Sequence, residues 1–191
     1  MQEQIDRIKK TAMQVFSEKN ADYGPSWLFF RFSSTVDQLW IKILRIRSLE
    51  EHGGVTAVGE GCEGEYFGLI NYAIIALMQR EAANALPTPA AALEDLTLLQ
   101  RIDEKLLLSL YDAAFEQARS LMQLKNSDYS DAWRKIELSS ITDLILVKLV
   151  RMKHILHTGE ELRVSEGIES QLCDIINYAI FALIRLEQGE E

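Results

Sequence analysis

The chain contains two copies of one segment, separated by a constant offset of 106 residues. The sequence KNADY at residues 19–23 returns as KNSDY at 125–129, and NYAI at 71–74 returns at 177–180. A segment of this length that recurs in register is a duplicated supersecondary unit. Each copy alone would bury only a low fraction of its surface. We therefore predict that the two copies pack into one pseudo-symmetric body.

The fold class follows from the spacing of apolar residues. Between Ile141 and Leu156 they recur every three or four residues, which is typical of helices, and no strand-like alternation is present. The sequence predicts an all-α protein of two tandem three-helix repeats packed as one pseudo-two-fold bundle. Thr88 and Pro89 are expected to cap and open a connecting helix. The expected helices are 4–18, 35–52, 62–80, 90–104, 107–124, 141–157 and 166–186.

Domain limits follow from the same pattern. Residues 1–86 form repeat one, 87–106 a linker with the connecting helix, and 107–191 repeat two. The second helix of each repeat has a marked start, because Ser34-x-x-Asp37 and Ser140-x-x-Asp143 both fit a capping box. Gly159 is expected to stop that helix in repeat two.

Composition excludes several classes of partner. The net charge is −9, which argues against general binding of nucleic acids or anionic membranes. No signal peptide and no apolar run long enough to span a bilayer is evident, so a cytoplasmic protein is expected. A fused pseudo-dimer is consistent with a monomer or with a homodimer.

Most positions on which the two copies agree are polar, whereas apolar positions drift. In repeat two, Lys148 and Arg151 share one side of the second helix, and Glu166 and Glu169 share a stripe of the third. If these stripes face each other beside the Asp-Tyr loop, they form a mixed-charge cleft. Its cations suit a phosphate, and its acids suit a metal or a proton.

The order K-N-x-D-Y, D-x4-K-x2-R, E-x2-E and N-Y-A resembles the nucleotide modification associated domain 1 family, in a tandem form. The resemblance implies work on nucleotides in DNA-base modification and covers most of the chain. Repeat one has Gly68 where repeat two has the family's acid, Asp174. We therefore expect one better-equipped site, in repeat two. The matching positions are Lys125, Asp128, Tyr129, Lys148, Arg151, Glu169, Asp174, Asn177 and Tyr178.

We expect a nucleotide or another phosphate-bearing small molecule as ligand, and magnesium is a candidate cofactor. Three acids are candidate catalytic groups: Asp128, Glu169 and Asp174. Glu166 and Glu169 are the candidate metal ligands. The expected nucleotide-binding residues are Lys125, Tyr129, Lys148, Arg151, Asn177 and Tyr178, with Asp22, Tyr23, Lys42 and Arg45 in repeat one.

Two other functions remain open at this point. All-α nucleoside triphosphate pyrophosphohydrolases also surround acidic metal ligands with short helices. Here, however, Glu166-x-x-Glu169 is the one suitably spaced acidic pair in the third helix of repeat two. A non-catalytic scaffold or regulator would use the duplicated polar face to dock a protein.

Overall fold

The computed structural model describes residues 1–52, 61–129, 131–159 and 167–189, except for the side chains of residues 126–129. These residues form helices and turns without a strand, which confirms the all-α prediction. The elements are α1 (Gln2–Tyr23), η1 (Ser26–Phe29), α2 (Phe32–Glu51), α3 (Glu63–Glu81), α4 (Pro89–Glu94), α5 (Thr97–Gln100), α6 (Glu104–Tyr129), η2 (Ala132–Lys135), α7 (Leu138–Thr158) and α8 (Ile168–Glu187).

The duplication seen in the sequence is also present in the structure. Under the offset, α1 corresponds to α6, η1 to η2, α2 to α7 and α3 to α8. The short 3-10 helix Ser26–Phe29 maps onto Ala132–Lys135 without a shift. The tandem-repeat prediction is therefore confirmed.

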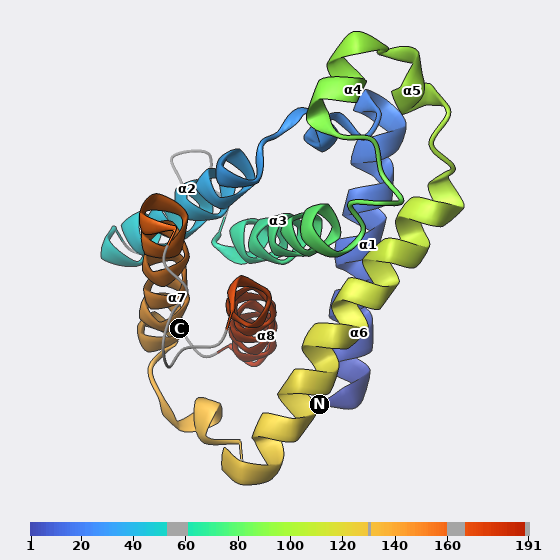
Figure 1. The fold of residues 1–191 in the computed structure, drawn as a ribbon. Helices are drawn as coiled ribbons and strands as arrows, with labels where there is room; N and C mark the ends of the chain where they lie inside the picture. The colour runs from blue at the N-terminus through green and yellow to red at the C-terminus, as the bar shows by residue number, and fades with distance from the viewer. Residues whose placement is uncertain (53–60, 130, 160–166, 190–191) are drawn as a thin grey trace.

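The six long helices form three layers, each made of one corresponding pair (Figure 1). The pair α3 and α8 lies in the middle. The pair α2 and α7 covers one side, and the pair α1 and α6 covers the other. Each helix therefore packs against its own counterpart, as a pseudo-two-fold axis through the middle layer requires.

The middle layer explains why the third helix of each repeat is so apolar. The runs AIIALM at 73–78 and AIFALI at 179–184 are buried at every position. A helix that is apolar on all sides belongs in the centre of a bundle. None of the described helices is long and apolar enough to cross a membrane.

The predicted capping boxes are wrong. Helix α2 begins at Phe32 and α7 at Leu138, one turn earlier than expected, and neither has a side-chain cap. Phe32 and Leu138 pack against the core, so tertiary contact sets the helix starts. The expected stop at Gly159, in the left-handed conformation, is confirmed.

The two aspartates of those boxes form cross-repeat ion pairs instead. Asp37 of α2 lies 2.6 Å from Lys153 of α7, and Asp143 of α7 lies 3.7 Å from Arg47 of α2. The two pairs are related by the repeat offset. They join the outer layer across the pseudo-two-fold axis.

Helix α1 runs to Tyr23, so Asp22 and Tyr23 occupy its last turn and not the loop that the sequence predicts. Gly24, with φ of 66°, ends the helix. The connecting helix is shorter than expected. Thr88 caps α4 as predicted, but Asp95 accepts hydrogen bonds from the backbone N–H and hydroxyl of Thr97 and the helix stops there.

An equivalent hydrogen bond in each repeat holds the chain between the 3-10 helix and the second long helix. Gln79 of α3 donates to the carbonyl of Phe30 at 3.0 Å. Arg185 of α8, the counterpart of Gln79, donates to the carbonyl of Ile136. Phe30 and Ile136 line the two cavities described below, so these bonds position a cavity wall.

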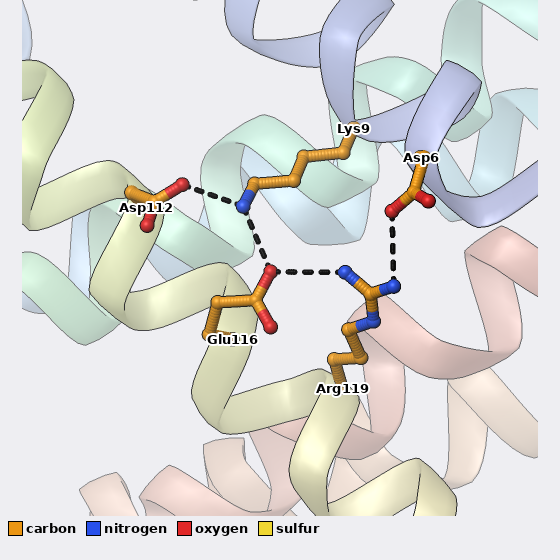
Figure 2. A network of polar contacts seen from close by, with 5 residues as sticks. All are labelled: Asp6, Lys9, Asp112, Glu116 and Arg119. Atoms are coloured by element: carbon orange, nitrogen blue, oxygen red, sulfur yellow. Dashed lines mark hydrogen bonds and ion pairs between the residues drawn. The ribbon is translucent and has the colours of Figure 1, made fainter. Parts of the chain in front are cut away.

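The outer pair α1 and α6 is joined by a charged network (Figure 2). Lys9 contacts Asp112 at 2.5 Å and Glu116 at 2.8 Å. Arg119 contacts Glu116 at 3.1 Å and Asp6 at 2.9 Å. Under the repeat offset, the residue that corresponds to Lys9 is the apolar Phe115, so this network is not repeated. These ion pairs stabilise the contact between α1 and α6 at one edge of the bundle.

Candidate functional site

A cavity of about 500 Å³ lies in repeat two between α6, η2, α7 and α8. Its size is that of a small-molecule site. Four polar side chains converge on it, and apolar and aromatic side chains form the rest of the wall. The polar residues are Lys125, Lys148, Asp174 and Asn177, and the others are Met122, Ala132, Trp133, Ile136, Leu144, Tyr178 and Phe181.

Asp174 is the central charge of this cavity. Its side chain is 5% exposed; Oδ1 lies 2.7 Å from Lys125 Nζ and Oδ2 lies 2.7 Å from Lys148 Nζ. The contact at Oδ1 is a hydrogen bond, whereas the contact at Oδ2 is an ion pair without hydrogen-bond geometry. Burying a carboxylate is costly unless cations compensate it. Among the described side chains that line the cavity, two lysines and one carboxylate sum to a positive charge.

This arrangement differs from the predicted facing of two stripes. Lys148 forms its ion pair with Asp174. Glu169 lies 2.5 Å from Arg80 of α3 and does not line the cavity. Partial burial opposes the shift, but the Arg80 hydrogen bond holds the pKa of Glu169 below its ordinary value. Glu166 lies outside the described residues.

The predicted metal pair of Glu166 and Glu169 stays a prediction, because Glu166 lies outside the described residues. Over residues 1–52, 61–129, 131–159 and 167–189, His, Cys, Asp and Glu side chains form no group of three that could hold a metal ion. Asp174, the acid inside the cavity, is surrounded by cations instead.

Arg151 lies one helical turn after Lys148 on α7, so the two side chains share a face. It is exposed and forms no ion pair with the described residues. An exposed guanidinium with unused donors is suited to a phosphate or a carboxylate. Arg151 does not itself line the cavity; it lies one turn from Lys148, which does, and is unpaired within the described part of the chain.

Aromatic side chains form one wall. Trp133 and Phe181 stack with ring centroids 4.4 Å apart and planes 3° from parallel. Tyr178 meets Phe181 edge to face at 6.4 Å, and the Arg134 guanidinium lies 4.2 Å over the Trp133 ring. Trp133 and Phe181 are mostly buried, so they form a rigid aromatic wall of the cavity, and the partly buried Tyr178 lies at its edge.

Asn177 brings an unsatisfied acceptor to the cavity. Its Nδ2 donates to the carbonyl of Ala118 at 2.8 Å, which fixes the amide orientation because a carbonyl can only accept. Its Oδ1 is buried and has no hydrogen-bond partner among the described residues. In repeat one, the hydroxyl of Tyr111 donates to Asn71 Oδ1 at 2.7 Å. Under the repeat offset, the residue that corresponds to Tyr111 is Ile5. Asn177 therefore has no equivalent hydroxyl donor.

Repeat one has a matching cavity of about 450 Å³. Among the described residues that line it, none is a carboxylate. Its lysine, Lys42, lies 2.8 Å from Glu65, whose side chain is 9% exposed and lies 2.8 Å from Arg45 Nη1 as well. Glu65 therefore pairs with a cation of the cavity from one helical turn before Gly68, and the expectation that repeat one has the less well-equipped site stays a prediction.

The two repeats have exchanged the acid between two positions of the third helix. Repeat one has Glu65 and Gly68, and repeat two has Gln171 and Asp174. The cation that lacks an ion pair also differs between the two repeats. Within the described residues, Arg151 lacks an ion pair in repeat two, whereas its counterpart Arg45 is paired.

The Asp-Tyr pairs lie near these cavities. Tyr23 lines the cavity of repeat one and is 75% exposed, whereas Asp22 is exposed and outside it. The side chains of Asp128 and Tyr129 are outside the described part of the chain, although their backbone completes α6. Their predicted roles stay predictions.

Sequence reasoning missed Glu65, which pairs with the cavity lysine Lys42, and the stacked pair Trp133–Phe181 in the wall of the other cavity. Glu65 had a detectable signal, because this glutamate lies one turn before Gly68 and its counterpart in repeat two is neutral. Phe181 lies within the apolar run at 179–184 and carries no local signal that separates it from the core.

The comparisons with known proteins concern the same two segments. No curated protein and no solved structure is similar enough to the chain to count as a match. The family model of nucleotide modification associated domain 1 matches at residues 19–79 and again at 125–186. These matches contain Lys42, Arg45, Lys148 and Arg151 of the second helices, together with Glu65, Asp174, Asn71 and Asn177. The chain therefore belongs to the nucleotide modification associated domain 1 family, in a tandem-repeat form.

Proposed function

We propose that this chain binds a nucleotide in the cavity of repeat two. One observation carries the proposal: Asp174 is buried between Lys125 and Lys148 inside a cavity of about 500 Å³ that has an aromatic wall. A net positive, half-apolar cavity fits a ligand that joins a planar ring to an anion. The family's link to nucleotide modification supports this class of ligand.

The parts of a nucleotide have matching parts of the site. The base lies against the aromatic wall of Trp133, Phe181 and Tyr178, where stacking is independent of base identity. The phosphate lies at Arg151, on the same face of α7 as Lys148. Lys148 is held by Asp174 at 2.7 Å and so remains oriented toward the cavity.

Isothermal titration calorimetry tests the proposal. The ligands are nucleoside 5′-monophosphates, the matching nucleosides and inorganic phosphate. We expect binding of nucleotides with dissociation constants below about 1 mM, and weaker binding of nucleosides, since Arg151 contributes only when a phosphate is present. Absence of binding by every nucleotide would overturn the proposal.

Arg151→Ala is expected to weaken nucleotide binding about tenfold and to leave nucleoside binding nearly unchanged. Lys153→Ala is the matched control, because Lys153 is also a cation of α7 but pairs with the exposed Asp37, away from the cavity. If both variants bind nucleotides as the wild type does, the phosphate assignment fails. If the wild type also binds no nucleotide, the polar face is better explained as a protein-docking scaffold.

A further inference from the structure

The two cavities differ in the charges that line them. In repeat two, the Asp174 carboxylate lies 2.7 Å from Lys125 Nζ and 2.7 Å from Lys148 Nζ. The corresponding residues of repeat one also line a cavity, of about 450 Å³, and they are Lys19, Lys42 and Gly68. No described residue in that lining is a carboxylate. Repeat one therefore keeps both lysines but lacks the acid that contacts both.

The two lysines of repeat one are accessible. Lys19 is exposed and forms no ion pair with the described residues, whereas its counterpart Lys125 is paired. Lys42 is paired with Glu65, which does not line the cavity, and the Lys42 side chain is still 26% exposed. Both amines thus belong to the cavity lining and to the solvent-accessible surface.

Asn20 adds a neutral donor next to Lys19. The indole Nε1 of Trp27 donates to Asn20 Oδ1 at 3.1 Å, which fixes the amide orientation because an indole N–H can only donate. Asn20 Nδ2 is therefore a donor, and it donates to no side chain or carbonyl of the described residues. Asn20 is only partly buried and lines the cavity. Two cations and one amide donor are a set that suits an anion.

The remaining wall determines which molecule can carry that anion. Tyr23 is 75% exposed, Phe67 and Tyr72 are partly buried, and all three line the cavity. Accessible aromatic rings favour contact with another ring. A volume of about 450 Å³ also lies in the range of small-molecule sites.

Glu65 limits the charge of the anion. Its carboxylate lies 2.8 Å from Lys42 Nζ, so any anion at Lys42 has a negative charge nearby. Like charges repel at short range, and a singly charged carboxylate meets less repulsion than a doubly charged phosphate. Asp174 is the internal example, because its single carboxylate places one oxygen at each lysine.

We infer that the cavity of repeat one binds a small aromatic carboxylate, whose anionic group takes between Lys19 and Lys42 the place that Asp174 has in repeat two. The ring of the ligand lies against the aromatic side chains of the wall. This site is separate from the nucleotide site proposed for repeat two. The two cavities then take ligands of different classes, because one contains its own carboxylate and the other receives it from the ligand.

Nuclear magnetic resonance of the full chain tests the inference with one reporter per cavity. The chain has three tryptophans: Trp27 lines the cavity of repeat one, Trp133 lines that of repeat two, and Trp40 lines neither. Their assigned indole ¹⁵N–¹H signals are followed during titration with benzoate, benzamide and phenyl phosphate.

We expect benzoate to shift the Trp27 signal with a dissociation constant of about 1 mM. Benzamide has nearly the same shape without the charge and should bind at least tenfold more weakly. Absence of a benzoate-dependent shift of Trp27 overturns the inference, as does equal binding of benzamide. Tighter binding of phenyl phosphate overturns the assignment of a carboxylate.

A lysine variant tests the cation assignment. Lys19→Ala should weaken benzoate binding about tenfold, because the ligand loses one of its two cations. Lys10→Ala is the matched control, since Lys10 is also an exposed lysine of α1 but does not line the cavity. Equal affinities of the two variants overturn the inference.

A matched pair at residue 68 tests whether the ligand replaces an internal acid. Asp and Asn have nearly the same shape, but only Gly68→Asp supplies a carboxylate to Lys19 and Lys42. Gly68→Asp should therefore bind benzoate at least fivefold more weakly than Gly68→Asn. Equal losses in the two variants contradict the inference, and circular dichroism verifies that each variant is folded.

The two reporters separate this inference from the proposed function. A benzoate-dependent shift of Trp27 that is lost in Lys19→Ala supports the inference, whether or not a nucleotide shifts Trp133. A nucleotide that shifts Trp133, together with a Trp27 signal that benzoate leaves unchanged, overturns the inference and supports the proposed function. A benzoate-dependent shift of Trp133 alone places the carboxylate in the other cavity and also overturns the inference.

Discussion

Lys42 lies across Gly68: a Cβ atom at residue 68 would stand 3.0 Å from Lys42 Cε and 3.1 Å from its Cδ. The lysine passes over the glycine and meets Glu65 at 2.8 Å. In repeat two the corresponding lysine stops at Asp174, the residue that replaces the glycine. The position of one carboxylate therefore determines how far along the third helix each lysine reaches.

The exchange of acids predicts that repeat one can be converted to the arrangement of repeat two. Glu65→Gln alone should lower the free energy of unfolding by about 1–2 kcal/mol, because Lys42 and Arg45 lose their shared carboxylate and both remain partly exposed. Adding Gly68→Asp should restore most of this loss, because the flexible end of Lys42 can move aside and meet the new acid. Urea denaturation measures both variants. A double variant that is less stable than Glu65→Gln would contradict the prediction that an acid at residue 68 can take over the ion pair with Lys42.

Tyr111→Phe should destabilise the bundle by about 1–3 kcal/mol, because it leaves the buried Asn71 Oδ1 without its donor. The phenolic hydroxyl is fully buried, and burial raises the pKa of Tyr111. Tyr72→Phe is the control: Tyr72 is half-buried and forms no hydrogen bond with the described residues. Thermal and urea unfolding of the two variants compare them directly, and equal losses would show that the Tyr111–Asn71 bond contributes nothing.

The network of α1 and α6 predicts an acid-dependent loss of stability. The hydrogen bond from Lys9, followed by that from Arg119, lowers the pKa of Glu116 from its ordinary value of 4.5. A carboxyl group with a lowered folded pKa contributes stability above its unfolded pKa and loses it as the pH falls through the folded pKa. Glu116→Gln should therefore be less stable than the wild type at pH 7, and this difference should shrink below about pH 4.

Urea unfolding of both proteins at several pH values measures the change at Glu116. Glu94→Gln is the control, since Glu94 is exposed and has no ion pair among the described residues. High salt should reduce the difference in stability between Glu116→Gln and the wild type at pH 7. The reason is that the two carboxylates that pair with Lys9 are substantially exposed and therefore screened by salt. A difference that is independent of pH would contradict an electrostatic role of Glu116.

Thr142 of repeat two forms hydrogen bonds with Glu50 and Tyr66 of repeat one. These bonds predict that substitutions of Thr142 and Tyr66 have non-additive effects on stability. The Thr142 hydroxyl donates to Glu50 Oε1 at 2.6 Å, which leaves its oxygen to accept from the buried hydroxyl of Tyr66 at 3.0 Å. Thr142→Val introduces the residue that repeat one has at Val36, and should cost about 1–3 kcal/mol, because the Tyr66 hydroxyl loses its acceptor.

Adding Tyr66→Phe to Thr142→Val should cost less than the sum of the two single changes, because the buried donor and its acceptor are removed together. Equilibrium unfolding of the wild type, both single variants and the double variant completes the cycle. Strict additivity would show that the two hydroxyls do not interact.

Much of the architecture could be predicted from the sequence, because the relevant signals are local and repeated. The helical period, the three helices of each repeat and the Thr88–Pro89 helix start all appear in short windows. The errors lie where distant contacts override a local signal. Ser34 and Asp37 resemble a capping box, yet the packing of Phe32 begins α2 earlier and Asp37 pairs with Lys153.

The candidate site shows the same division. Comparison of the two copies identified Lys148 and Asn177, the family resemblance added Asp174, and the structure gathers all three at one cavity. The comparison did not predict that Glu169 faces Arg80, because that contact depends on how α8 crosses α3 in the middle layer. A helical stripe defines which residues share a face but not which neighbour that face meets.

The sequence by itself determined the duplicated all-α architecture, the correspondence of the repeats and the polar residues they share, since these depend on periodicity and register. Only the tertiary structure decided that the repeats are chemically unequal. In repeat one, Glu65 pairs with Lys42 from one turn before Gly68. Asn71 accepts a hydrogen bond from Tyr111 of the other repeat, whereas Asn177 has Ile5 as the counterpart of that tyrosine, and this difference arises only because the repeats pack against each other.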